Sequence, residues 1–301
     1  MKVADVQTIL TAGLVALAIV VGRASAAQNQ GASPAELVRQ TVKNEISANN
    51  GSAKFMFLDR KQTLRGWQTR LIAETEQATA GMLIAINDKP LTPEQYQSEL
   101  ARLERLVNNP EELRKKQRSE KEDTERTTRI VRALPDAFLF ESDGTEMGTD
   151  SVGQPGDELI RLKFRPNPRY SPPSRVEQVL AGMQGYVLID VNKRRIAKID
   201  GTLFKEVSFG WGILGHLDKG GHFLVQQAAV GEDQWEVTRM NLGFTGKELI
   251  FKSINIKSDE ICSDFRPVPS NLTFAQAVEL LKKQKAEFAE SRDNASGQNQ
   301  R

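Results

Sequence analysis

The chain has 301 residues, a formal net charge of +2 and 39% hydrophobic residues. This length is enough for one large or two small domains with a substantial hydrophobic core. A charge so close to zero argues against a nucleic-acid-binding protein, which needs a clustered basic face. Because Cys262 is the single cysteine, no intramolecular disulfide can form. We expect that thiol to be a small buried core group and not a nucleophile.

Residues 1–26 have the pattern of a cleavable signal peptide. Lys2 gives a positive start, residues 9–22 are almost wholly apolar, and Ala24-Ser25-Ala26 has the small-x-small form that signal peptidase accepts. The apolar run is shorter than the roughly 20 residues that a membrane-spanning helix needs. We therefore expect cleavage after Ala26 and a periplasmic or secreted protein without a transmembrane span. The alternative is an uncleaved N-terminal anchor.

Three short amphipathic segments predict helices packed on a sheet. The first, 34–48, begins with the capping box Ser33-Pro34-Ala35-Glu36 and carries apolar residues at a spacing of four. The second covers 174–183, and the third covers 273–288. Residues 291–301 are polar, and we expect them to form a disordered tail.

Residues 92–134 form a segment of a different kind. It begins with the capping box Thr92-Pro93-Glu94-Gln95, and Asn109-Pro110 restarts a helix. Residues 112–129 are densely charged, with acidic residues four positions before basic ones, which stabilises an exposed helix. We expect a helical hairpin inserted in the domain, either as a solvated arm or as a surface that holds a partner protein.

The rest of the chain has the pattern of short strands joined by tight turns, which are typical of antiparallel neighbours. Few long helical crossovers interrupt them, so a parallel, doubly wound sheet is not expected. The sequence predicts strands over 54–58, 69–75, 81–86, 135–143, 159–164, 186–191, 194–200, 202–209, 222–230, 234–244 and 247–257. The predicted fold class is α+β, with a curved antiparallel sheet in a single domain over 27–290.

None of the sequence motifs predicts a catalytic, cofactor or metal site. Residues 210–215 match G-x-G-x-x-G, but another strand follows where a dinucleotide site needs a helix. His216 and His222 lie too far apart for a typical zinc pair, even with Asp218 between them. Asp190 and Asp200 flank one hairpin, and at strand ends such residues usually end pairing or meet neighbouring basic side chains.

Aromatic and large aliphatic residues near the later strands are the candidates for lining an apolar cavity. A curved antiparallel sheet that is open on one side needs an apolar filling. We expect the loop at 210–215 to cap such a cavity or the core. The candidate residues are Trp211, Ile213, Leu214, Trp235, Phe223 and Phe209.

The strands from 182 to 251 resemble the LolA/LolB-like periplasmic lipoprotein carriers and the related outer-membrane lipoprotein-sorting proteins. The shared pattern is a short helix, then Gly185–Asp190, the return strand Arg194–Asp200, and Trp235–Met240 near the end. The resemblance covers about a quarter of the chain. It implies a half-barrel closed by lid helices over an apolar cavity that carries acyl chains or lipoproteins. No binding arginine of the family has a matching position here.

The sequence therefore predicts an exported, non-enzymatic binder or carrier of lipid or lipoprotein-like apolar ligands. The alternative function is a cell-envelope interaction module that uses the 92–134 segment to hold a protein partner. A hydrolase is the third functional hypothesis. It requires an acid and a nucleophile within hydrogen-bond distance of His216 or His222.

Overall fold

The computed structural model describes residues 33–48, 53–63, 65–210, 214–231, 234–248 and 252–298, with side chains as far as residue 286. The predicted signal peptide and its cleavage site lie outside the described residues. Contacts divide the chain into two compact units, residues 1–52 with 121–259 and residues 53–120 with 260–301. The expectation of one domain over 27–290 stays a prediction.

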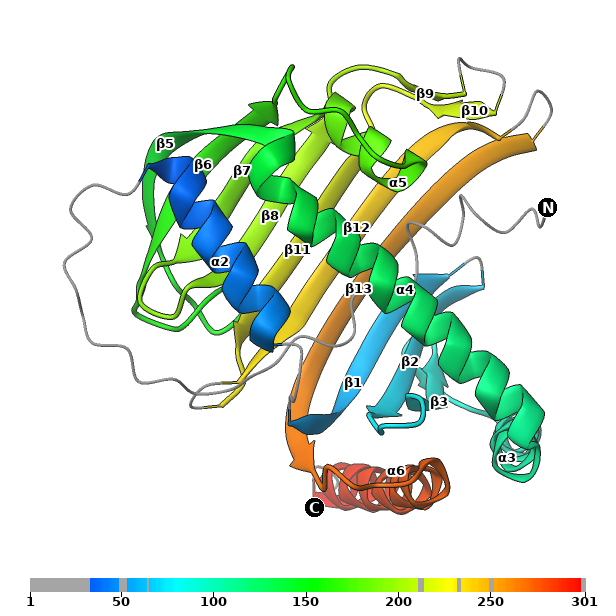
Figure 1. The fold of residues 1–301 in the computed structure, drawn as a ribbon. Coiled ribbons are helices and arrows are strands. Elements are labelled where there is room, and N and C mark those ends of the chain that lie inside the picture. The colour runs from blue at the N-terminus through cyan, green and yellow to red at the C-terminus, as the bar shows by residue number, and fades with distance from the viewer. Residues whose placement is uncertain are drawn as a thin grey trace. The chain divides into compact units, whose positions relative to one another are not determined.

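The first unit is an antiparallel sheet with helices on one face (Figure 1). Its strand order is β13-β12-β11-β8-β7-β6-β5, and the β9–β10 hairpin adds to β12. Its helices are α2 (Pro34–Ala48), the second part of α4 (Pro110–Ala137), α5 (Arg175–Gln178) and the 3₁₀ turn η1 (Val179–Gly182). Its strands are β5 (Phe138–Met147), β6 (Glu158–Pro166), β7 (Met183–Asp190), β8 (Arg195–Leu203), β9 (Val207–Phe209), β10 (Gly215–Leu217), β11 (His222–Ala229), β12 (Trp235–Glu248) and the first half of β13 (Lys252–Val268).

Alternating apolar residues explain why these strands bury one face under the helices. Val187 and Ile189 of β7 belong to the core that α2 and α4 cover, whereas Leu188 between them packs in another cluster. Gly201 of β8 leaves room for a ring, because a Cβ there would lie 2.5 Å from the Cε1 atom of Phe223. The sequence thus places a flat aromatic side chain against the backbone of the neighbouring strand.

The second unit is a smaller antiparallel sheet of order β4-β3-β2-β1-β13 with its own core. Leu103 of α3 and Leu281 of α6 are fully buried there with Met82 of β3. The apolar stripe of the predicted 92–134 hairpin packs into this core. Its elements are β1 (Lys54–Thr63), β2 (Gly66–Ala73), β3 (Ala80–Ile86), β4 (Lys89–Pro90), α3 (Pro93–Asn108), the start of α4, the second half of β13 and α6 (Phe274–Gln298).

The predicted fold class is confirmed: the protein is α+β with an antiparallel, curved sheet that does not close. The helical pair at 92–134 is present as α3 and α4. Within the described part of the chain, no helix is both long enough and apolar enough to span a bilayer.

Several element boundaries differ from the sequence prediction. Residues 135–137 of the strand expected at 135–143 end helix α4, and β1 and β12 continue past their expected ends at 58 and 244. Three further differences have a clear cause in the structure. The strand expected at 202–209 is two strands, because after Leu203 the Phe204 amide donates to the Gly182 carbonyl and turns the chain. Strand β13 continues to Val268 instead of 257, since β1 supplies a ladder partner for its polar second half. Helix α6 runs to Gln298, past the predicted end at 288 and into the segment whose expected disorder stays a prediction.

Candidate functional site

An apolar cavity of about 200 Å³ lies in the first unit, between its sheet and its helices. Aliphatic and aromatic side chains from both layers form nearly all of the wall. The helical side consists of Val38, Glu45 and Ile46 of α2, Thr124, Thr127, Thr128, Ile130, Val131 and Leu134 of α4, and Val176, Val179 and Leu180 of α5 and η1.

The sheet side of the cavity follows the alternation of the strands. On β11 it takes every second residue, Phe223, Val225 and Gln227. On β12 it takes Met240, Leu242 and Phe244 in the same way. The other lining residues of the sheet and its edge are Phe138, Phe140, Phe164, Met183, Val187, Ile189, Ile196 and Ile199. The apolar side chains of the sheet and the helices therefore do not fill all of the space between the two layers.

A buried ion pair holds one polar side chain in this wall. Glu45 is 1% exposed, and its Oε1 atom accepts hydrogen bonds from Arg195 Nε at 3.0 Å and from the Ile196 amide at 2.6 Å. Burial raises the pKa of the Glu45 carboxyl above its ordinary value, and the charge of Arg195 opposes that shift. Among the described residues, the second oxygen, Oε2, has no hydrogen-bond partner.

Gln227 is a second buried polar residue of the cavity wall whose side-chain oxygen has no partner among the described residues. Its side chain is 5% exposed, and no described residue donates to its Oε1 atom. Gln227 follows Gln226, which is the last residue of β11 that pairs with β8. Glu45, which bonds to the amide of Ile196, and Gln227 both belong to the cavity wall.

The six residues that the sequence predicts as cavity lining have different locations in the structure. Phe223 does line it. Phe209 and Leu214 pack in the same core without forming its wall, and Trp235 packs in a separate cluster with Leu159, Leu188 and Ala197. Trp211 and Ile213 lie outside the described residues. A ligand contact by any of the six stays a prediction.

The sequence reasoning missed Glu45 and Gln227, although each breaks an apolar pattern. Glu45 follows Val38 and Val42 on the apolar stripe of its helix, where a charged residue is unexpected. Gln227 ends the alternating set of Phe223 and Val225. A polar residue at a position that the period assigns to the core is the signal that points to them.

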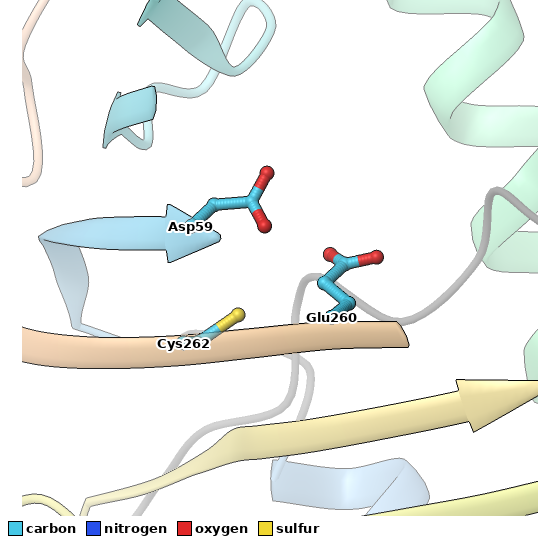
Figure 2. Close-up of side chains that lie close together, drawn as sticks. All are labelled: Asp59, Glu260 and Cys262. Atoms are coloured by element: carbon cyan, nitrogen blue, oxygen red, sulfur yellow. The ribbon is translucent and has the colours of Figure 1, made fainter. Parts of the chain in front are cut away.

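A cluster of potential metal ligands lies in the second unit, on β1 and β13 (Figure 2). One ligand atom each from Asp59, Glu260 and Cys262 lies within 4.8 Å of the others, and all three residues are buried. Asp59 is paired with Cys262 and Lys61 with Glu260 across the antiparallel ladder, so these side chains share one face. Carboxylates and thiolates are both ligands that zinc accepts.

The charges of this cluster are compensated in part by its own residues. Lys61 Nζ lies 2.5 Å from Glu260 Oε2. Burial, with the nearby charge of Glu260, raises the pKa of Asp59 to about 6, against the opposing charges of Lys61 and Arg70. The ammonium group of Lys61 therefore already pairs with Glu260, and Asp59 keeps its proton below about pH 6.

The two histidines lie in different environments. His216 Nε2 is 3.3 Å from Asp218 Oδ1, with Glu206 also within reach, whereas His222 Nε2 is 2.7 Å from Asn241 Oδ1. Ser208 is the cross-strand neighbour of His216, but its hydroxyl donates to Glu206. Among the described residues, neither histidine is bonded to a serine or cysteine, so the geometry provides no activated nucleophile at either.

The remaining motifs have structural roles. The glycine-rich motif at 210–215 falls in the sequence between β9 and β10, which are antiparallel strands, and this is not the strand–helix context of a dinucleotide site. Asp190 accepts from the Lys193 amide at 2.8 Å at one end of the β7–β8 hairpin. Asp200 accepts from the Tyr186 hydroxyl at 3.2 Å and pairs with Tyr186. The two carboxylates are not brought together.

Comparisons with known proteins do not identify a family for this chain. No protein-family model matches the chain, and no curated protein matches its sequence. A solved structure described as a "putative outer membrane lipoprotein-sorting protein domain from Vibrio parahaemolyticus" is similar, with a TM-score of 0.30 and 10% identity over 76% of this chain and 91% of that one. At so low a TM-score the likeness carries no argument about this chain.

Proposed function

We propose that this protein is a non-enzymatic binder or carrier of lipid-like apolar ligands in the bacterial periplasm. The observation that carries the proposal is the apolar cavity between the sheet and the helices of the first unit. Ligand sites are typically concave, mostly apolar and supplied with a few polar groups, as this cavity is. The signal-peptide pattern of residues 1–26 supports an exported location.

The volume of the cavity limits the ligand. At about 200 Å³ it is a little larger than an engineered apolar cavity of about 150 Å³ that binds benzene. It is smaller than typical drug-sized ligand pockets, which begin at about 300 Å³. We therefore expect it to take a short aliphatic chain or the end of a longer one.

Filling the cavity tests this proposal directly. We expect Val225→Phe to weaken the binding of dansyl-undecanoic acid, because the larger ring occupies space that the ligand needs. An overlap of this kind typically costs about 1–3 kcal/mol, which corresponds to roughly a tenfold to hundredfold loss of affinity. Fluorescence titration of the probe into the mature protein measures it.

Leu224→Phe is the matched control. Leu224 adjoins Val225 on β11 and is absent from the cavity wall, so we expect its variant to bind like the parent protein. Equal affinity of the two variants would show that the probe binds elsewhere. Failure of the parent protein to bind any apolar probe, together with a ligand-free mass on purification from periplasm, would refute the proposed function.

A further inference from the structure

The cluster of Asp59, Glu260 and Cys262 brings three potential metal ligands together inside the second unit (Figure 2). One ligand atom from each residue lies within 4.8 Å of the other two. The three residues are 6%, 7% and 7% exposed, so this is not an ordinary group of acidic residues on a surface. Charged groups at such depth are usually paired or bind a metal ion.

One carboxyl group of the cluster is left unsatisfied by the protein around it. Among the described residues, the buried Oδ1 atom of Asp59 has no hydrogen-bond partner. Glu260 differs, because Lys61 Nζ lies 2.5 Å from its Oε2 atom. Burial and the charge of Glu260 raise the pKa of Asp59 to about 6, so at neutral pH a proton no longer neutralises this carboxyl. A cation beside it would supply the missing charge.

The pairing of β1 with β13 holds the three side chains together. Asp59 lies directly opposite Cys262, and Glu260 is two residues before Cys262, so all three side chains lie on one side of β13 (Figure 2). Side chains opposite each other on antiparallel strands have Cβ atoms about 5 Å apart. Because the ligands come from paired strands and not from a loop, their arrangement is largely preformed.

The separations fit a metal ion after small movements of the side chains. Bonds of about 2.3 Å to sulfur and about 2.1 Å to oxygen, at tetrahedral angles, place the ligand atoms roughly 3.5 Å apart. The limit of 4.8 Å found here is roughly 1.3 Å larger, a difference that small side-chain rotations remove.

The donor atoms select the class of ion. Calcium and magnesium take oxygen ligands, so a thiolate does not suit them. Zinc and similar divalent transition-metal ions accept thiolate and carboxylate together. Three protein ligands also leave the fourth position of a tetrahedral site for water.

We propose that Asp59, Glu260 and Cys262 bind one zinc ion or a similar divalent transition-metal ion. The ion takes the place of the thiol proton of Cys262, and Lys61 competes with it for Glu260. This site goes beyond the proposed function and is independent of it, because that function rests on the cavity of the first unit.

Cobalt(II) is a suitable probe, because it takes the same ligands as zinc and absorbs light. A thiolate bound to cobalt gives a charge-transfer band in the near ultraviolet, and Cys262 is the single cysteine of the chain. We expect titration of the full, reduced mature protein at neutral pH to produce this band, with one cobalt ion per chain. Added zinc is expected to remove it.

Two variants assign the band to the cluster. Asp59→Asn is expected to weaken cobalt binding by more than about tenfold, since even the loss of an outer-shell partner typically costs roughly 10- to 100-fold. Lys61→Gln is expected to tighten it, because the ammonium group that competes for Glu260 is gone. Asp264→Asn, an exposed position on the same strand, is the matched control and is expected to bind like the parent protein. Far-ultraviolet circular dichroism checks that each variant is folded.

The outcomes are independent of ligand binding in the cavity. Absence of the charge-transfer band from the parent protein would overturn the metal site. Cobalt that binds without this band, or that binds Asp59→Asn as tightly as the parent protein, would belong to other groups such as His216 and Asp218 and would also overturn it. Neither result bears on the proposed function, which the fluorescence titration tests separately.

Discussion

Replacing Arg195 with methionine is expected to lower the free energy of unfolding by about 3–5 kcal/mol, because it leaves the Glu45 charge buried without a partner. The two side chains are 5% and 1% exposed, and Arg195 Nε lies 3.0 Å from Glu45 Oε1. Methionine keeps much of the packing volume of the arginine stem. Urea unfolding followed by far-ultraviolet circular dichroism measures the difference.

The double variant Glu45→Met, Arg195→Met isolates the cause. Replacing both charges of a buried pair by apolar groups is often neutral or stabilising, so the double variant is expected to recover most of the loss. Arg239→Met is the control, because its ion pair with Asp259 is partly exposed and is expected to contribute less than about 1 kcal/mol. A double variant no more stable than Arg195→Met would show that packing, and not the unpaired carboxylate, dominates.

Asp59→Asn is expected to stabilise the protein at alkaline pH by up to about 3 kcal/mol, since a shift of one pKa unit corresponds to 1.36 kcal/mol. Burial and the charge of Glu260 raise the pKa of Asp59 to about 6 from the ordinary 3.8. The neutral amide of asparagine avoids the cost of ionising this side chain in the folded protein.

The sign of the pH dependence follows from proton binding. Between pH 3.8 and about 6 the folded state holds a proton on Asp59 that the unfolded chain has released. The contribution of Asp59 to stability is therefore highest below pH 3.8, falls as the pH rises through this window, and is constant above it. The difference between Asp59→Asn and the parent protein is expected to grow over the same window.

Urea titrations at acidic, neutral and alkaline pH measure this difference. Asp88→Asn is a suitable control, because the hydrogen bond from Arg60 holds the pKa of exposed Asp88 below its ordinary value. Its substitution is therefore expected to give no stabilisation at alkaline pH. If Asp59→Asn destabilises the protein equally at every pH, Asp59 acts through its hydrogen bonding or packing and not through its charge.

Local signals in the sequence were sufficient for many elements of the fold. The capping box at residues 92–95 predicts the start of α3, and both of its reciprocal hydrogen bonds are present. Asn192-Lys193 predicts the turn between β7 and β8. These features depend on residues within a few positions of one another, so their physical cause can be read along the chain.

Strand register is one feature that local signals did not reveal. Ile196 and Ile199 both line the cavity although they are three residues apart, which regular alternation does not allow. The pairing of β7 with β8 skips Ala197, and this bulge reverses the alternation. A single extra residue thus decides which side chains face the cavity, and only the pairing with the partner strand shows where that residue lies.

The sequence by itself determined the signal-peptide pattern, the helix starts, most of the strands and the α+β class, because each arises from short-range periodicity and capping. Only the tertiary structure decided the candidate site. It brings Glu45 to Arg195 across 150 positions and places both Glu45 and Gln227 in the wall of one cavity. The physical reason is that burial, strand register and desolvation depend on contacts between residues that are far apart in the sequence. A single residue or a short segment therefore does not determine them.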